Sequence, residues 1–148
     1  MGGSWNGDVN DCWDHCFEKE EQLSTDIVNI VSNQGFDGVD LDYEYCYDTE
    51  NNRHGRNCNN SSTGKYSDAK AKYFLEEMTI LLRQKLDTIG SDMELTHAPM
   101  DSDLVTDSPY FQILARQNGI INFLMPQVSS VFIGHTRLYY TYQLIVLI

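Results

Sequence analysis

Hydrophobic and polar positions along the chain alternate between a helical period and a strand period. In residues 18–31, four apolar side chains recur at spacings of 4, 3 and 1, which predicts one face of a helix that ends at Gly35. These four residues are Leu23, Ile27, Ile30 and Val31. From residue 39 to 45, apolar and acidic residues alternate strictly, which predicts a β-strand.

The same two periods continue along the chain. Residues 68–89 predict a second helix that ends at Gly90, and residues 93–98 predict a second strand. The apolar stripe of that helix is Leu75, Met78, Leu82, Leu86 and Ile89. Ser108 and Pro109 predict the start of a third helix, which ends at Gly119, before a third strand at residues 120–125. Helices and strands in this alternation predict an α/β fold, with a parallel sheet and helices outside it.

Composition adds a strong acidic bias. Lys plus Arg number 10 and Asp plus Glu number 22, so the formal net charge is −12. Nucleic acids and anionic membrane surfaces attract Lys/Arg clusters, so we expect neither as a partner. The longest apolar run, residues 144–148, is far shorter than the roughly 20 residues of a membrane span. We expect a monomeric globular domain, and the first residues carry no signal-peptide pattern.

The cysteines leave disulfides, thiols and zinc ligation open. They are Cys12, Cys16, Cys46 and Cys58. Two disulfides allow three pairings, whereas the Cys-x11-Cys spacing of the second pair suits zinc poorly. Two overlapping Asn-x-Ser sequons at residues 59–62 fit a secreted, extracellular protein. The Cys-x3-Cys spacing of the first pair is tolerable for zinc, but the second pair favours disulfides or free thiols, and the chain has no Gly-rich nucleotide loop, so we expect no metal and no cofactor.

The densest candidate chemistry lies on the predicted strand at residues 39–45. Side chains on a strand alternate faces, so Asp40, Asp42 and Glu44 share one face at about 6.6 Å from each to the next. Like-charge repulsion and lost hydration should raise at least one of their pKa values. Glu44 lies at the C-terminal end of the strand, where α/β enzymes place their active sites, and is therefore the candidate general acid.

Two other interpretations of this acidic face stay open. A row of carboxylates can bind Ca²⁺, although Gly38 is not at the position that an EF-hand loop requires. A solvated edge strand is also acidic on one face, although the apolar opposite face of residues 39–45 argues against it.

Residues 37–44, Asp-Gly-Val-Asp-Leu-Asp-Tyr-Glu, resemble the Asp-x-x-Asp-x-Asp-x-Glu signature of family 18 glycoside hydrolases, the chitinases and their relatives. Three further segments agree in order with that family's third, fifth and sixth strands: Gly-Gly-Ser-Trp at 2–5, Leu-Thr-His-Ala-Pro at 95–99 and Ile-Asn-Phe-Leu-Met-Pro-Gln at 121–127. The resemblance implies an incomplete TIM (β/α)8 barrel, about strands 3 to 6 with their helices. Residues 1–127 would then be a partial family 18 catalytic domain.

The resemblance also implies an activity. Such an enzyme cleaves chitin, the β-1,4-linked polymer of N-acetylglucosamine, with retention, and the substrate's own acetamido oxygen is the nucleophile. Glu44 would be the general acid/base, Asp42 would orient the acetamido group, and Asp40 would tune the protonation of Asp42. Asp37 and Gly38 would be structural members of the motif. The expected partners are chitin or N-acetylglucosamine oligosaccharides.

Four further residues are candidates for sugar binding. Trp5 follows a strand end on the active-site side, Tyr47 follows Glu44, and Met125 and Gln127 alternate on the last predicted strand. Trp13 and His97, by contrast, are expected to be structural.

Beyond Gln127 the chain departs from the family pattern. Ser129 stands where the family has a tyrosine that bonds the acetamido carbonyl, and residues 128–148 predict at most one apolar strand. This segment is either a divergent end or not part of the barrel, and a translated intron stays open because Val128-Ser129 can be encoded by a splice-donor sequence. An open barrel section leaves sheet edges and carboxylates uncovered, so we expect these 148 residues alone to be marginally stable and of low or no activity.

Three alternatives to a chitinase remain. An endo-β-N-acetylglucosaminidase that acts on N-glycans carries the same signature, and a chitinase-like lectin binds chitin without cleaving it. An inactive fragment is the third. Glu44 favours an enzyme, whereas Ser129 argues for the lectin.

Overall fold

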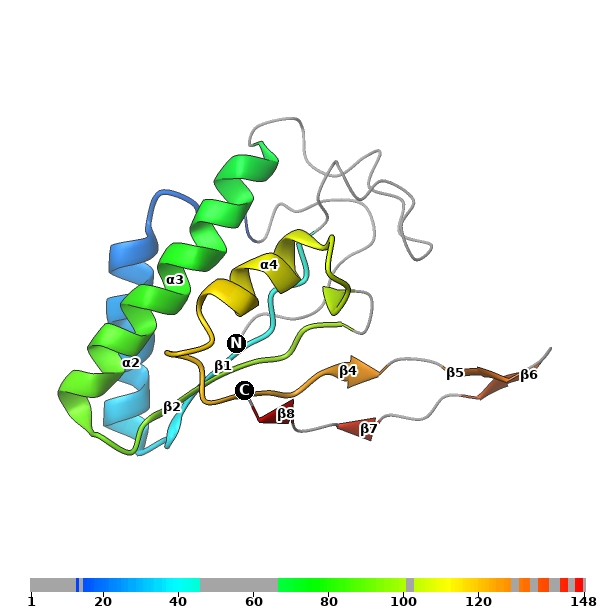
Figure 1. The fold of residues 1–148 in the computed structure, drawn as a ribbon. Coiled ribbons are helices and arrows are strands. Elements are labelled where there is room, and N and C mark those ends of the chain that lie inside the picture. Colours follow the sequence, from blue (N-terminus) through cyan, green and yellow to red (C-terminus); the bar gives the residue numbers. More distant parts are fainter. Residues whose placement is uncertain are drawn as a thin grey trace.

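Parallel strands followed by helices form the centre of the molecule. The computed structural model describes residues 13, 15–45, 67–100, 103–128, 131–133, 136–138, 142–143 and 146–147. Three of the strands in this part of the chain are parallel neighbours: β1 (Gly38–Leu41), β2 (Glu94–His97) and β3 (Phe123–Leu124). The helices are α2 (Glu20–Gln34), α3 (Asp68–Ile89) and α4 (Pro109–Arg116), and they lie on one side of these strands (Figure 1). The predicted α/β class is confirmed.

Local signals in the sequence set the helix ends. Gly35 ends α2 in the left-handed conformation at φ 69°, where a side chain would be strained. The Ser108 hydroxyl accepts hydrogen bonds from the backbone N–H groups of Tyr110 and Phe111, and Pro109 occupies the first turn of α4. Helix α3 ends at Ile89, directly before Gly90, as predicted.

Two apolar faces are narrower than the sequence predicts. On α2, Val28 and Val31 are buried, but Ile30 is 55% exposed. On α3, the predicted stripe is buried from Leu75 to Leu86, but Ile89 is 37% exposed. Ile30 and Ile89 belong to the predicted apolar faces but lie at the exposed margin of each face.

The end of the chain forms short antiparallel pairings instead of the single apolar strand expected there. β4 (Gln127–Val128) pairs with β7 (Tyr142–Gln143), and β5 (Val131–Ile133) pairs with β6 (Thr136–Leu138). β8 (Val146–Leu147) joins the central sheet antiparallel to β3, so the sheet order is β1-β2-β3-β8. Residues 128–148 thus add strands without a helix among the described residues (Figure 1).

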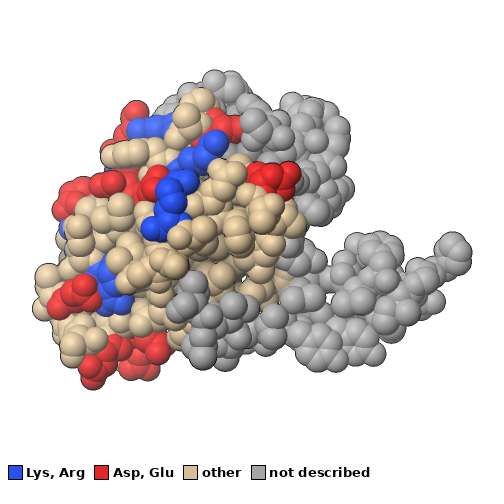
Figure 2. Space-filling model, viewed as in Figure 1, with Lys and Arg blue, Asp and Glu red and all other residues tan. Residues whose placement is uncertain are grey.

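Charged side chains tie the helices to one another. The Lys85 ammonium lies 2.6 Å from the Glu21 carboxylate and joins α3 to α2, and Arg116 lies 3.1 Å from Glu76 and joins α4 to α3. On the face drawn in Figure 2, Lys and Arg are interspersed with Asp and Glu. Each such exposed pair stabilises the fold by at most about 1 kcal/mol, so the buried apolar contacts between the layers dominate.

Candidate functional site

The acidic residues of β1 and its continuation lie on the face that points away from the helices. Asp40, Asp42 and Glu44 are each half-buried. The intervening residues are buried, with exposed fractions of 2–7%; they are Val39, Leu41, Tyr43 and Tyr45. The predicted alternation is confirmed, and it continues to residue 45 although the regular strand ends at Leu41.

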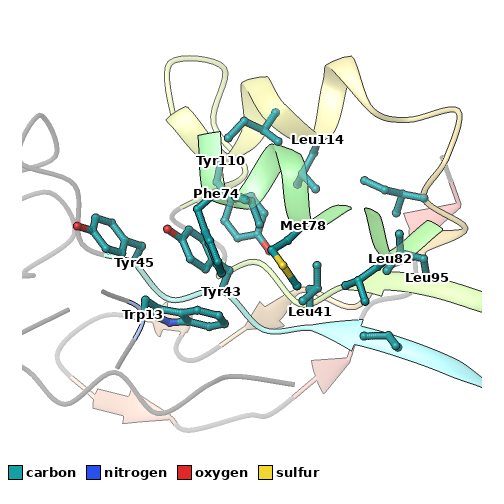
Figure 3. Packing of buried hydrophobic residues seen from close by; sticks show 14 of the residues in the cluster. Trp13, Leu41, Tyr43, Tyr45, Phe74, Met78, Leu82, Leu95, Tyr110 and Leu114 are labelled. Carbon is teal, nitrogen blue, oxygen red and sulfur yellow. The ribbon is translucent and has the colours of Figure 1, made fainter. Parts of the chain in front are cut away.

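Aromatic packing fixes the end of this strand. Tyr43 meets Trp13 edge-on with ring centroids 4.7 Å apart, and it stacks on Tyr45 at 5.7 Å (Figure 3). The Tyr43 hydroxyl also donates a 3.1 Å hydrogen bond to the Ala71 carbonyl of α3. Glu44 is therefore held between two anchored tyrosines, which fixes its backbone although its own side chain points to the other face. Trp13 is a packing residue, as expected.

Gly38 allows the first two strands to approach closely. It pairs with Glu94 in the register of β1 and β2. A Cβ atom at this position would lie 2.0 Å from the Glu94 carbonyl oxygen, far inside van der Waals contact. The motif glycine is thus required by strand packing, in keeping with its predicted structural role. Asp37, the other structural member, is exposed, and its carbonyl accepts from the Glu94 backbone N–H at 2.8 Å.

Asp40 is tied to the second strand. The Thr96 hydroxyl donates a 2.6 Å hydrogen bond to Oδ1 of Asp40, and the two residues are register partners. Thr96 is nearly fully buried, whereas Asp40 is half-buried, so the hydroxyl end of this bond is the better shielded from water. Thr96 was not among the predicted site residues. The signal for it is its place between Leu95 and His97, which face the helices and so turn the threonine toward the acids.

Asp42 is hydrogen-bonded to Gln127, the first residue of β4. The Gln127 amide donates to Oδ1 of Asp42 at 2.5 Å and to the Ala98 carbonyl at 3.0 Å. Burial and the nearby Glu44 carboxylate raise the pKa of Asp42 from 3.8 to about 6, with a smaller contribution from Asp40, while the Gln127 bond acts in the opposite direction. The prediction that a carboxyl pKa in this row is raised is confirmed, and the group concerned is Asp42.

His97 lies on the opposite, helix-facing side and is fully buried. The Thr79 hydroxyl donates to the Leu75 carbonyl at 2.7 Å, so its oxygen accepts from Nε2 of His97 at 3.3 Å. The Tyr110 hydroxyl then donates to Nδ1 at 3.0 Å. Burial lowers the pKa of His97 to about 3, so the ring is neutral and structural, as expected.

The remaining predicted site residues are placed in part. Met125 is half-buried, and its backbone N–H donates to the His97 carbonyl at 2.8 Å. Trp5, Tyr47 and Ser129 lie outside the described residues, as do the sequons and every cysteine except Cys16, which is half-buried. Their predicted roles, and the disulfide pairing, stay predictions.

An apolar hollow of about 320 Å³ lies between α2 and the start of β1. Ile30 and Phe36, both more than half exposed, form part of its lining together with Asp40. It is at the end of β1 that is remote from Glu44. Asp40 is the one titratable group among the described residues that line it, so the hollow meets the acidic row at Asp40 alone, away from Asp42 and Glu44.

No three His, Cys, Asp or Glu side chains among the described residues are grouped so as to hold a metal ion. In the same part of the chain, no helix is both long and apolar enough to cross a membrane.

Comparison with protein-family models gives no match to this chain. Comparison with curated proteins likewise gives none.

Proposed function

We propose that the chain carries the catalytic strand of a retaining glycoside hydrolase that cleaves β-1,4-linked N-acetylglucosamine polymers. The observation that carries the proposal is the row of Asp40, Asp42 and Glu44 on one face of β1, with Asp42 at a pKa of about 6. The family resemblance of residues 37–44 supports the same activity, and with it a (β/α)8 barrel of which β1, β2 and β3 would be neighbouring strands.

In the proposed reaction, Glu44 donates a proton to the glycosidic oxygen while the acetamido oxygen of the substrate attacks the anomeric carbon. The C–O bond to the leaving sugar breaks, and an oxazolinium ion forms. Asp42 accepts the acetamido N–H and stabilises the positive charge on that nitrogen. Water then attacks the anomeric carbon and gives its proton to Glu44, while the bond from that carbon to the acetamido oxygen breaks and the acetamide re-forms. These events regenerate the acid, and the two inversions together retain the configuration.

The hydrogen bonds to the carboxylates of Asp40 and Asp42 support this division of roles. Thr96 holds Asp40 and Gln127 holds Asp42, so neither aspartate has to reorganise when charge develops on the substrate. The backbone of Glu44 is held by the buried tyrosines on either side of it, Tyr43 and Tyr45. A fixed backbone supports the role of general acid, because it holds the carboxyl group within reach of the leaving oxygen.

The test is hydrolysis of chitin oligosaccharides by the protein expressed from its complete transcript, with the 148-residue chain assayed beside it. Glu44→Gln removes the proton donor at constant shape, and a loss of about 10²–10⁴-fold in kcat is expected. Glu94→Gln, an exposed change on the next strand, is the matched control and should keep the wild-type rate.

Two results would contradict the proposal. Equal rates for the wild type and Glu44→Gln would remove Glu44 from the chemistry. Tight binding of the oligosaccharide without cleavage by the wild type would identify a lectin. Cleavage of an N-glycan core in preference to chitin would keep the mechanism and change the substrate to that of an endo-β-N-acetylglucosaminidase.

A further inference from the structure

Gln127 forms a cross-strand link in the acidic site. Its side-chain nitrogen lies 2.5 Å from Oδ1 of Asp42 and 3.0 Å from the Ala98 carbonyl oxygen. Asp42 follows β1 and Ala98 follows β2, so this one amide joins three neighbouring chain segments. The link connects positions 85 residues apart in the sequence.

The backbone around Gln127 is itself fixed. Its N–H donates to the Pro99 carbonyl at 2.8 Å, and it pairs in parallel with Met100. The side chain therefore starts from a defined position, and the two acceptors define its orientation: a flipped amide would set its oxygen against the Asp42 carboxylate and the Ala98 carbonyl.

From this geometry we infer that Gln127 is a positioning residue that holds Asp42, and not a residue that binds sugar directly. Both amide hydrogens are committed to protein acceptors, so the side chain has no donor left for a sugar hydroxyl. The catalytic consequence of this inference rests on the proposed function, whereas the hydrogen bond between Gln127 and Asp42 is independent of it.

Holding Asp42 has two effects. The bond fixes Oδ1, which leaves Oδ2 to meet the acetamido N–H of the substrate. It also stabilises the ionised form of Asp42 against burial and against the carboxylates of Glu44 and Asp40, which all favour the protonated form. Without the bond, Asp42 should be both less ordered and more readily protonated.

The test is a titration of Asp42 in Gln127→Met, which keeps the side-chain length and removes both donors. The protein expressed from its complete transcript is labelled with ¹³C-aspartate, and the Asp42 carboxyl resonance is assigned by its absence from Asp42→Asn. The Asp42 pKa is expected to rise by about 1 unit, the equivalent of one hydrogen bond to a charged group. In hydrolysis assays, kcat should fall about tenfold at neutral pH with KM changed less than twofold, and the acidic limb of the kcat profile should move up with the Asp42 pKa.

Gln117→Met is the matched control. Gln117 is also largely buried, and its amide donates to the Glu76 carbonyl, but it lies at the end of α4. This variant should lose a similar amount of stability and leave the Asp42 titration unchanged. If Gln127→Met does not fold, Gln127→Glu decides, because it keeps the shape and adds a like charge that should raise the Asp42 pKa further.

An unchanged Asp42 pKa in a folded Gln127 variant would overturn the inference. So would a large rise in KM with the Asp42 titration unaltered, which would show direct sugar binding. A wild-type protein that cleaves no glycoside would defeat the proposed function alone, because the titration still reports whether Gln127 holds Asp42.

Discussion

Replacing Asp42 by asparagine should stabilise the fold at neutral pH and leave it unchanged in acid. Burial and the Glu44 carboxylate raise the pKa of Asp42 from 3.8 to about 6. At 1.36 kcal/mol per pKa unit this shift corresponds to about 3 kcal/mol. Because Asp42 is only half-buried, solvent screens part of the effect, and we expect about 1–1.5 kcal/mol in practice.

The sign follows from the protons that each state binds. Between pH 3.8 and about 6 the native state holds a proton on Asp42 that the unfolded chain has already lost. The stabilisation that comes from protonating Asp42 is therefore fully present below pH 3.8. It is lost as the pH rises from 3.8 through about 6, and above that pH it no longer changes. Asparagine carries no charge at any pH and can still accept the Gln127 bond, so the variant lacks this fall.

Urea unfolding at pH 3.5 and pH 7.5 measures the effect. The difference in unfolding free energy between Asp42→Asn and wild type should be near zero at pH 3.5 and about 1–1.5 kcal/mol in favour of the variant at pH 7.5. Asp37→Asn, at an exposed carboxylate of the same motif, controls for the change in net charge. A variant that is less stable than wild type at pH 7.5 would refute the reasoning, because it would show that ionised Asp42 stabilises the fold.

Three further predictions concern the layers that hold the acidic strand, each measured as the free energy of unfolding in urea. Gly38→Ala should cost about 2–3 kcal/mol through its clash with the next strand, while Gly119→Ala, with open space around it, should cost less than about 0.5; equal losses would contradict the close approach. Tyr43→Phe should cost about 1 kcal/mol, the net worth of its bond to the α3 backbone. Thr79→Val should cost about 1–3 kcal/mol by leaving the buried His97 N–H without its acceptor, and an unaltered midpoint would exclude that tautomer.

Much of the candidate site follows from period-two patterning. Apolar and acidic residues alternate so sharply at 39–45 that the two faces are predictable without a structure. The end of α2 and the start of α4 are predictable for a similar reason, because Gly35 and the Ser108-Pro109 pair have local stereochemical effects that need no distant partner. The end of α4 is not, since the helix stops at Arg116 and not at Gly119.

The features that were not predictable depend on distant contacts. Periodicity shows that Ile30 and Ile89 share a face with buried neighbours, but only the neighbouring layer decides where burial stops. The contact between Gln127 and Asp42 depends on the register of the parallel strands across 85 positions. A local irregularity makes this register harder to predict. The N–H of Asn122 donates to the Leu95 carbonyl, and the N–H of Met125 donates to the His97 carbonyl. Three positions on one strand thus match two on the other, as in a β-bulge.

The antiparallel pairings of residues 128–148 are not predictable from the sequence of that segment. That segment lacks a helical or strand period of useful length, and its strands are only two or three residues long. Such short strands are specified by their partners and not by their own pattern.

The measurement that tests the central claim most directly is the anomeric configuration of the first product released from chitin oligosaccharides. Proton NMR within minutes of mixing, before mutarotation, should show the β-anomer, and oligosaccharides of unacetylated glucosamine should not be cleaved, because they lack the acetamido nucleophile. An initial α-anomer, or equal cleavage of the unacetylated chain, would contradict substrate-assisted hydrolysis with Glu44 as acid and Asp42 as its partner.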